Sequence, residues 1–342
     1  MTLALDPKKA TLAHTAATPG LLFGSCYDAA TGNYYGAGLA FAVYRLDTRA
    51  EKPAAEKKWT HHDNYVSALA WLDGVVVSAG FDRRLVWTKA DSGEKLREVS
   101  AHEGWVRDLA IVPGGKLLAT VGDDMLVKLW DAATGELIRT MSGHAAKTPE
   151  GFATAIYALA ASPDGKYLAS GDRIGEVCVW EIESGKRLAL IKAPEFYTYD
   201  RRQRDRSIGG IRALLFLPDG RLAIGGLGPV SNVDGFVGPA RFELWDWQAG
   251  KMLHRGQDKH HAILEQLEFL PEQNLMIGAG GGDAGPFLGF WDLAAEAPLH
   301  KAKPKTHIHH FVFESAGPRL LAVGDGGFQI WNFSGQEAAK AN

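Results

Sequence analysis

The feature that most constrains this chain is a short segment of alternating apolar and polar residues that ends at an aromatic anchor and recurs throughout. One copy is MLVKLWDA, in which Trp130 is the anchor. Successive anchors are 43, 43, 50, 65, 46 and 40 residues apart. The alternation, and the enrichment in Val, Leu, Phe and Trp, indicate half-buried strands and not helices. The seven anchors are Tyr44, Trp87, Trp130, Trp180, Trp245, Trp291 and Trp331.

Each repeated unit divides into four strands joined by tight turns. The third unit gives WVRDLAIVP, LLATVG, MLVKLWDA and LIRTMSGH, and the fourth repeats the arrangement. In turns such as SPDG at 162–165, proline fixes its φ and glycine accepts a positive φ. Four strands in a period of about 40–45 residues are typical of a propeller blade. The sequence therefore predicts an all-β fold, a seven-bladed β-propeller of four-stranded antiparallel blades, as a single domain over residues 1–342.

Several segments resemble the WD-repeat β-propeller family. They are GHAAK at 143–147, SPDGKYLASG at 162–171, and LWD at 129–131 and 244–246. The resemblance covers roughly residues 12–333. It implies a fold, but it does not select a function, because propellers carry many unrelated activities.

The family pattern also implies a buried set of hydrogen-bonded side chains in each blade. The third blade matches it fully, through His102, Thr120, Asp124 and Trp130. Such a set stabilises neighbouring strands because each buried polar group finds a partner.

Other blades depart from this pattern. The second blade has His62, Ser78 and Asp82, but a one-residue change in spacing predicts that Thr88 takes the tryptophan position and that Trp87 points to the other side of the sheet. Ile174 stands at the aspartate position of the fourth blade, and the fifth blade has no such set. We therefore expect these last two blades to be held mostly by apolar packing. For closure of the ring, we expect residues 2–5 to supply the outer strand of the last blade, as is usual for the family.

The positions of the long connections predict where function lies. In a propeller, turns between the second and third strands share one face with the connections from an outer strand to the next blade. Five irregular segments are expected on that face: 27–38, 146–154, 194–207, 228–240 and 280–286. Because long loops on a rigid frame often bind ligands, we predict a protein-interaction module or scaffold that uses this loop-rich face. The alternative is that the loops are merely tolerated.

The segment 194–207 combines aromatic residues with arginines, the residue types enriched at interface hot spots. Its charge balance is only four arginines against three acids, which favours a protein partner over nucleic acid bound by Arg-rich loops. Further arginines are expected in other turns of the same face. The candidate partner-binding residues are Phe196, Tyr197, Tyr199, Arg201, Arg202, Arg204, Arg206, Arg83, Arg84 and Arg173.

Composition and motifs narrow the remaining classes of function. The formal charge of −3 gives no general attraction to nucleic acid or membranes, and the two distant cysteines, Cys26 and Cys178, fit a reducing, cytoplasmic compartment. No catalytic motif, metal site or cofactor loop is found: the histidine clusters precede first strands, and GAGGGDAG at 278–285 leads into a strand, so no helix N-terminus follows it. We expect a chain that is monomeric by itself and has neither cofactor nor metal. The alternative is an enzyme or small-molecule site in the central channel.

Overall fold

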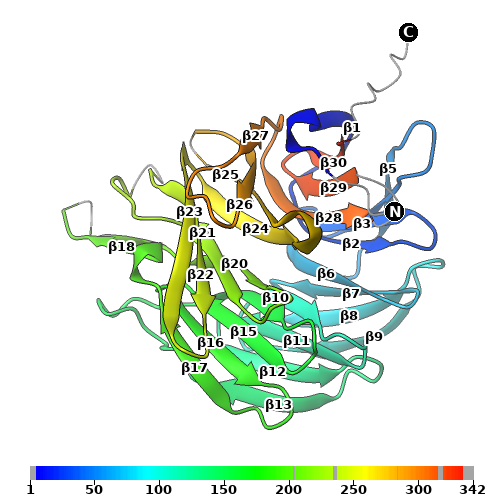
Figure 1. Cartoon of the computed structure of the whole chain (residues 1–342). Coiled ribbons are helices and arrows are strands. Elements are labelled where there is room, and N and C mark those ends of the chain that lie inside the picture. Colours follow the sequence, from blue (N-terminus) through cyan, green and yellow to red (C-terminus); the bar gives the residue numbers. More distant parts are fainter. Residues whose placement is uncertain (1–4, 203–204, 234–236, 283, 315–318, 334–342) are drawn as a thin grey trace.

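The computed structural model describes residues 5–202, 205–233, 237–282, 284–314 and 319–333. In these ranges, the secondary structure consists of strands and three short 3-10 turns, η1 (Pro7–Lys9), η2 (Pro194–Phe196) and η3 (Pro271–Gln273). Seven four-stranded sheets are arranged around a ring (Figure 1). The predicted seven-bladed β-propeller is confirmed.

The first four blades are built from consecutive strands, with the innermost strand first in each. Blade 1 contains β2 (Leu22–Asp28), β3 (Asn33–Gly38), β4 (Val43–Asp47) and β5 (Ala55–Trp59). Blade 2 contains β6 (Val66–Leu72), β7 (Val75–Gly80), β8 (Arg84–Lys89) and β9 (Lys95–Ser100). Blade 3 contains β10 (Val106–Ile111), β11 (Leu117–Gly122), β12 (Leu126–Asp131) and β13 (Leu137–Ser142). Blade 4 contains β14 (Ile156–Ala161), β15 (Tyr167–Asp172), β16 (Glu176–Glu181) and β17 (Arg187–Lys192).

The last three blades follow a two-stranded hairpin of β18 (Tyr197–Asp200) and β19 (Arg206–Gly209), whose β18 lies at the left edge of Figure 1. Blade 5 contains β20 (Ile211–Phe216), β21 (Leu222–Leu227), β22 (Pro239–Asp246) and β23 (Lys251–His261). Blade 6 contains β24 (Ile263–Leu270), β25 (Leu275–Gly281), β26 (Phe287–Asp292) and β27 (His300–Ala302). Blade 7 contains β28 (Ile308–Glu314), β29 (Arg319–Gly324), β30 (Gly327–Asn332) and β1 (Thr11–Ala17).

The core consists of apolar layers between neighbouring sheets. Between blades 3 and 4, for example, Val127 and Leu129 belong to the same buried cluster as Ile156 and Trp180. The innermost strands contact one another in ring order, and β28 contacts β2, so the circle closes. Successive side chains of a strand point to opposite faces of its sheet. Each sheet of the ring therefore buries apolar residues on both of its faces, against the sheets on either side.

The strand that closes the ring differs from the expectation. The outer position of blade 7 is occupied by β1, which pairs antiparallel with β30 from Thr11↔Asn332 to Ala17↔Gly327. The prediction that residues 2–5 supply this strand is wrong, because β1 already covers that edge. Residues 2–4 lie outside the described ranges, and Leu5 instead exchanges backbone hydrogen bonds with the Gln273 side chain.

In blade 3, the four side chains of the family pattern form one hydrogen-bonded chain. His102 Nδ1 donates to Asp124 Oδ1 (2.8 Å), and His102 Nε2 lies 2.8 Å from Thr120 Oγ1. Trp130 Nε1 donates to the same hydroxyl oxygen (2.9 Å). These contacts connect the start of the blade to β11 and β12, so they hold the three inner strands in one register.

Blade 4 contains an equivalent set that the sequence analysis missed. His144 Nδ1 donates to Asp172 Oδ2 (2.8 Å), His144 Nε2 lies 2.7 Å from Ser170 Oγ, and Trp180 Nε1 donates to Ser170 Oγ (2.8 Å). The prediction that this blade lacks the carboxylate is wrong. Asp172 follows Ser170 by two positions, whereas Asp124 follows Thr120 by four. Asp172 therefore supplies the carboxylate that Ile174, at the expected position, cannot supply.

Blades 2 and 5 modify the pattern in different ways. In blade 2, Thr88 lies opposite Val76 and takes the expected tryptophan position, while Trp87 Nε1 donates to the Ala132 carbonyl of the next blade (2.8 Å), which confirms the predicted change of face. In blade 5, buried Arg241 and Glu243 form an ion pair (2.6 Å), so apolar packing is supplemented by a polar network that the sequence analysis did not anticipate.

Truncation tests the closing strand. Removing residues 1–17 deletes β1 and leaves the β30 edge unpaired, so we expect the melting temperature to fall by more than about 5 °C. Removing residues 1–4 should change it by no more than about 1 °C. Thermal unfolding followed by circular dichroism measures both, and equal losses in the two truncations would contradict the assignment of β1.

The buried histidine of blade 4 predicts a pH dependence of stability. Burial alone would lower the pKa of His144, but the hydrogen bonds and charges of Asp172 and Cys178 together outweigh it and raise the pKa from 6.5 to about 9. The folded state thus holds a proton that the unfolded chain releases, so this stabilisation is complete below pH 6.5 and is lost as pH rises through about 9.

Urea unfolding of the wild type and of His144→Gln measures this effect. We expect the difference in their free energies of unfolding to shrink by on the order of 2 kcal/mol between pH 6 and pH 10. A difference that does not change with pH would show that His144 is neutral in the folded protein.

Candidate functional site

A β-bulge lies near the start of every innermost strand. In β10, for example, Val106 pairs with Gly122 and Asp108 pairs with Val121, which leaves Arg107 without a partner in the ladder. A bulge re-aims the side chain of the extra residue. The same irregularity recurs in all seven blades, and the residues skipped are Phe23, Ser67, Arg107, Tyr157, Arg212, Glu265 and His309.

Glycine on the second strand makes this bulge possible in six blades. The residue before the bulge pairs there with Gly38, Gly80, Gly122, Gly226, Gly280 or Gly324. A Cβ at Gly122 would lie 2.7 Å from the Trp105 carbonyl oxygen, closer than such atoms can approach. In blade 4 the position belongs to Asp172, whose side chain is the carboxylate bound by His144.

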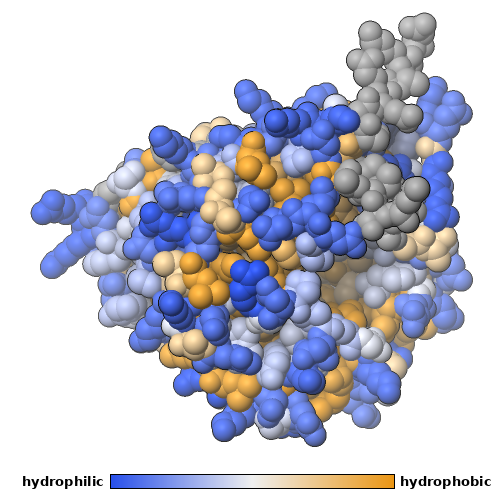
Figure 2. Space-filling view, viewed as in Figure 1, coloured by the Kyte–Doolittle hydropathy of each residue, from blue (hydrophilic) through white to orange (hydrophobic). Residues whose placement is uncertain are grey.

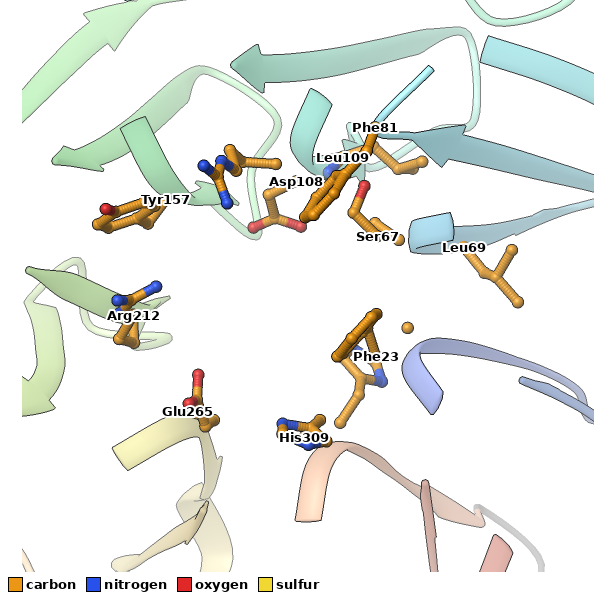
Figure 3. Close-up of a pocket in the computed structure, with 14 residues that line it drawn as sticks. Phe23, Ser67, Leu69, Phe81, Asp108, Leu109, Tyr157, Arg212, Glu265 and His309 are labelled. Atoms are coloured by element: carbon orange, nitrogen blue, oxygen red, sulfur yellow. Dashed lines mark hydrogen bonds between the residues drawn. The ribbon is translucent and has the colours of Figure 1, made fainter. Parts of the chain in front are cut away.

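The seven bulge residues surround the mouth of the central channel. They line one cavity of about 230 Å³ to which every innermost strand contributes. Figure 3 shows side chains such as Phe23, Arg212 and Glu265 converging on its open centre. Because the bulges lie where the innermost strands begin, the cavity opens on the face that carries the outer-to-inner connections, which we call the mouth face.

Aromatic side chains form a continuous arc along part of the mouth. Phe81 and Trp105 stack with ring centroids 4.4 Å apart and planes 4° apart, and Tyr65 lies 5.7 Å from Phe81. Phe23 continues the arc, 6.3 Å from Tyr65 and 5.6 Å from His309. Trp105 is 44% exposed, and Phe23, Tyr65 and Phe81 are half-buried, so solvent reaches the arc mainly at Trp105.

We call the seven bulge residues the bulge ring. Two of its members are arginines that pack on aromatic faces. The Arg107 guanidinium lies 4.8 Å from the Trp105 ring and 5.3 Å from the Tyr157 ring, and its Nε donates to Asp123 (2.5 Å). The Arg212 guanidinium lies 3.9 Å from the centre of the same Tyr157 ring. Stacking fixes both side chains with a cation–π attraction of about 0.5–1 kcal/mol at exposed sites.

Acidic and histidine side chains complete the cavity wall. Burial raises the pKa of Asp108 to about 7, although its carboxylate accepts the backbone N–H of Leu159 (2.9 Å). Burial lowers the pKa of His310 to about 4, so this imidazole is neutral at pH 7. Burial also opposes the charged form of His309, but the hydrogen bond to Asp325 and the negative charges of Glu265 and Asp325 together raise its pKa. The channel mouth therefore combines cationic, anionic and neutral groups.

No metal site is found in the described part of the chain, where no cluster of three or more His, Cys, Asp or Glu side chains could hold an ion. His307 and His309 do share a carboxylate, since their ring nitrogens lie 3.7 Å and 2.9 Å from Asp325. The sequence analysis missed this aspartate, which comes from the turn between β29 and β30.

Four of the five predicted insertions lie on the mouth face. Segments 146–154 and 194–207 join an outer strand to the next innermost strand, and 228–240 and 280–286 join a second strand to a third. The prediction for 27–38 is wrong, because this range contains the end of β2, a short turn on the opposite face and all of β3. Its Tyr34 and Tyr35 are buried in the core.

The insertion 194–207 divides into a buried anchor and an exposed hairpin. Phe196 is 0% exposed and packs among core residues such as Ile211, so it is not a contact for a partner. Tyr197 and Tyr199 are half-buried, and their hydroxyls donate to Glu150 and Asp205. The remaining hairpin candidates Arg201, Arg202 and Arg206 are exposed, whereas Arg204 lies outside the described residues.

The other predicted arginines differ in their availability. Arg83 is exposed in the turn between β7 and β8. Arg84 is held in ion pairs with Asp63 (2.7 Å), Asp82 (2.8 Å) and Glu98 (2.9 Å). Arg173 donates to the carbonyl oxygens of Ala153 and Ser207, and so joins two insertions. The sequence analysis thus placed four of the five insertions on one face, but it missed the aromatic arc and the seven bulge residues on that face.

A protein-family model described as "WD domain, G-beta repeat" matches residues 93–131 and 135–181. Each match begins at an outer strand, covers three strands of the next blade and includes one of the complete histidine–hydroxyl–aspartate–tryptophan sets. Together with the seven-bladed ring, these two matches confirm the resemblance to the WD-repeat β-propeller family. No helix in the described ranges is long and apolar enough to cross a membrane.

Curated relatives share part of their length with this chain. Protein hir1 of Schizosaccharomyces pombe is 29% identical over 152 residues, which cover 43% of this chain and 16% of that protein. Nuclear distribution protein PAC1 of Arthroderma otae is 26% identical over 250 residues (65% and 49%). The ribosome biogenesis protein WDR12 homolog of Chlamydomonas reinhardtii is 33% identical over 152 residues (38% and 32%). The chain thus spans less than half the length of each.

Exposure predicts contrasting roles for two tryptophans. Trp130 is 3% exposed and hydrogen-bonded, so Trp130→Ala should cost about 3–5 kcal/mol of stability. Trp105 belongs to the exposed arc, so Trp105→Ala should cost no more than about 1 kcal/mol. Urea unfolding compares the two variants, and an equal loss of stability would show that Trp105 serves the core.

Proposed function

We propose that this protein is an interaction scaffold that binds a protein partner across the mouth face. The observation that carries the proposal is the exposed stack of Phe81 and Trp105 beside Arg107. Tryptophan and arginine are enriched at the centres of protein interfaces, and tryptophan supplies a large contact area with little loss of conformational freedom. Trp105 is exposed to solvent, and the Arg107 guanidinium packs on both rings of the stack.

The surrounding insertions support the same face. Segments 146–154 and 194–207 flank the channel mouth, and segment 228–240 lies beside them in the next blade. Figure 2 shows one side of the molecule, where hydrophilic residues dominate the outline and hydrophobic residues are visible between them.

The proposal includes neither catalysis nor a cofactor. The cavity at the channel mouth is small, and the aromatic arc extends beyond it onto the open face, which suits a polypeptide better than an enclosed small molecule. Cys26 and Cys178 are buried free thiols, which supports the predicted reducing, cytoplasmic location. The printed names of the relatives concern different processes, so they do not select a pathway.

Affinity capture from the native lysate tests this function. The full chain carrying Trp105→Ala and Arg201→Glu should recover at least tenfold less of each specific partner than the wild type, because both changes lie on the mouth face. Lys116→Glu is the matched control, since Lys116 is exposed in a turn of the opposite face. The proposal fails if no protein is captured above background, or if the control loses binding as the double variant does.

A further inference from the structure

A second cavity lies beside the channel mouth, between the hairpin and the innermost strands of blades 4 and 5. It measures about 660 Å³, and we call it the hairpin cleft. One wall comes from segment 146–154, with Phe152 and Ala153, and another comes from β19. Tyr157 and Arg212 line both the hairpin cleft and the channel cavity, so the two spaces adjoin.

Arg173 gives the hairpin cleft a fixed shape. Its guanidinium donates to the Ala153 carbonyl (3.1 Å) on one insertion and to the Ser207 carbonyl (3.2 Å) and hydroxyl (3.3 Å) on the other. All three acceptors are neutral, so these hydrogen bonds hold the loops together without cancelling the positive charge. The hairpin cleft is therefore preorganised and keeps a cation in its wall.

Arg212 presents a second charge with unused hydrogen-bonding capacity. Its guanidinium stacks 3.9 Å from the centre of the Tyr157 ring. Within the described residues, no hydrogen bond or ion pair of the Arg212 side chain is found, in contrast to Arg107, which is bound to Asp123. Stacking leaves the edge of a guanidinium free, and this edge can donate two parallel hydrogen bonds to a carboxylate.

The charges of the two cavities differ. The lining of the hairpin cleft contains three arginines, Arg173, Arg206 and Arg212, and one acid, Asp205. The Asp205 carboxylate accepts a hydrogen bond from the Tyr199 hydroxyl. The channel cavity instead sets Arg107 and Arg212 against Asp108 and Glu265. An anionic group is therefore attracted to Arg212 from the side of the hairpin cleft.

We propose that the hairpin cleft binds an acidic segment of the protein partner, with a carboxylate of that segment on Arg212. An adjacent apolar side chain packs on Phe152, which is 38% exposed at the rim. This inference rests on the proposed function and specifies the chemistry of the partner. An acidic peptide fits better than nucleic acid, because the hairpin cleft offers a short pocket with an apolar wall and not an extended track of cations.

Fluorescence anisotropy with two labelled peptides tests the proposal. The probe is fluorescein-Gly-Glu-Glu-Phe-Glu-Glu-Gly, and its uncharged counterpart replaces every Glu with Gln. We expect the acidic peptide to bind the full chain at least tenfold more tightly than its counterpart. Arg212→Gln should weaken acidic-peptide binding at least fivefold, and Arg212→Lys should retain part of it, because lysine keeps the charge but loses the planar fork.

Arg221→Gln is the matched control, since Arg221 precedes β21 on the opposite face and is paired with Asp219. Melting curves establish that all variants are folded. The proposal is overturned if the two peptides bind equally, if Arg212→Gln has no effect, or if a single-stranded dT oligonucleotide of ten nucleotides binds more tightly than the acidic peptide. If the acidic peptide does not bind while partner capture still depends on Trp105, only the acidic class is excluded and the scaffold function stands.

Discussion

The close approach between the innermost and second strands, at a glycine beside the bulge in six of the seven blades, is the constraint on which the mouth face depends. Where β10 passes β11, the Trp105 carbonyl lies so near Gly122 that no side chain fits there. That approach leaves one extra residue on the innermost strand, and its side chain turns to the channel. The repeated backbone thus places seven side chains around the mouth of the channel, and the residue type differs from blade to blade. In this protein two of the seven are arginines stacked on aromatic rings.

The polar sets inside the blades are a less uniform source of stability. Blades 3 and 4 join a histidine, a hydroxyl, an aspartate and a tryptophan, whereas blade 5 uses Arg241 and Glu243. In blade 6, Trp291 Nε1 is buried without a partner among the described residues. Apolar packing between sheets is common to all blades, so it supports the ring, and the polar sets fix the register locally.

The fold and the placement of four insertions on one face could be predicted because they depend on the spacing of the anchors and the lengths of the loops. One error arose because a single residue serves two purposes. Asp172 fills the position that is glycine in six blades and also supplies the carboxylate of its set. The sequence analysis assumed a fixed spacing from the hydroxyl residue to the aspartate, and it therefore missed Asp172. The glycines and asparagine of 27–38 indicated a loop, although Tyr34 and Tyr35 are core residues. The arc of Phe23, Tyr65, Phe81 and Trp105 joins distant segments, and only the closed ring brings them together.

Hydrogen–deuterium exchange of the full chain, with and without its captured partner, tests the central claim most directly. If the mouth face is the interface, exchange should slow in the peptides that contain Tyr65, Phe81 and Trp105 and in the hairpin of β18 and β19. The turns at 113–116 and 162–166, on the opposite face, should exchange at the same rate in both samples. Protection of those turns, with none at the aromatic arc, would contradict the account.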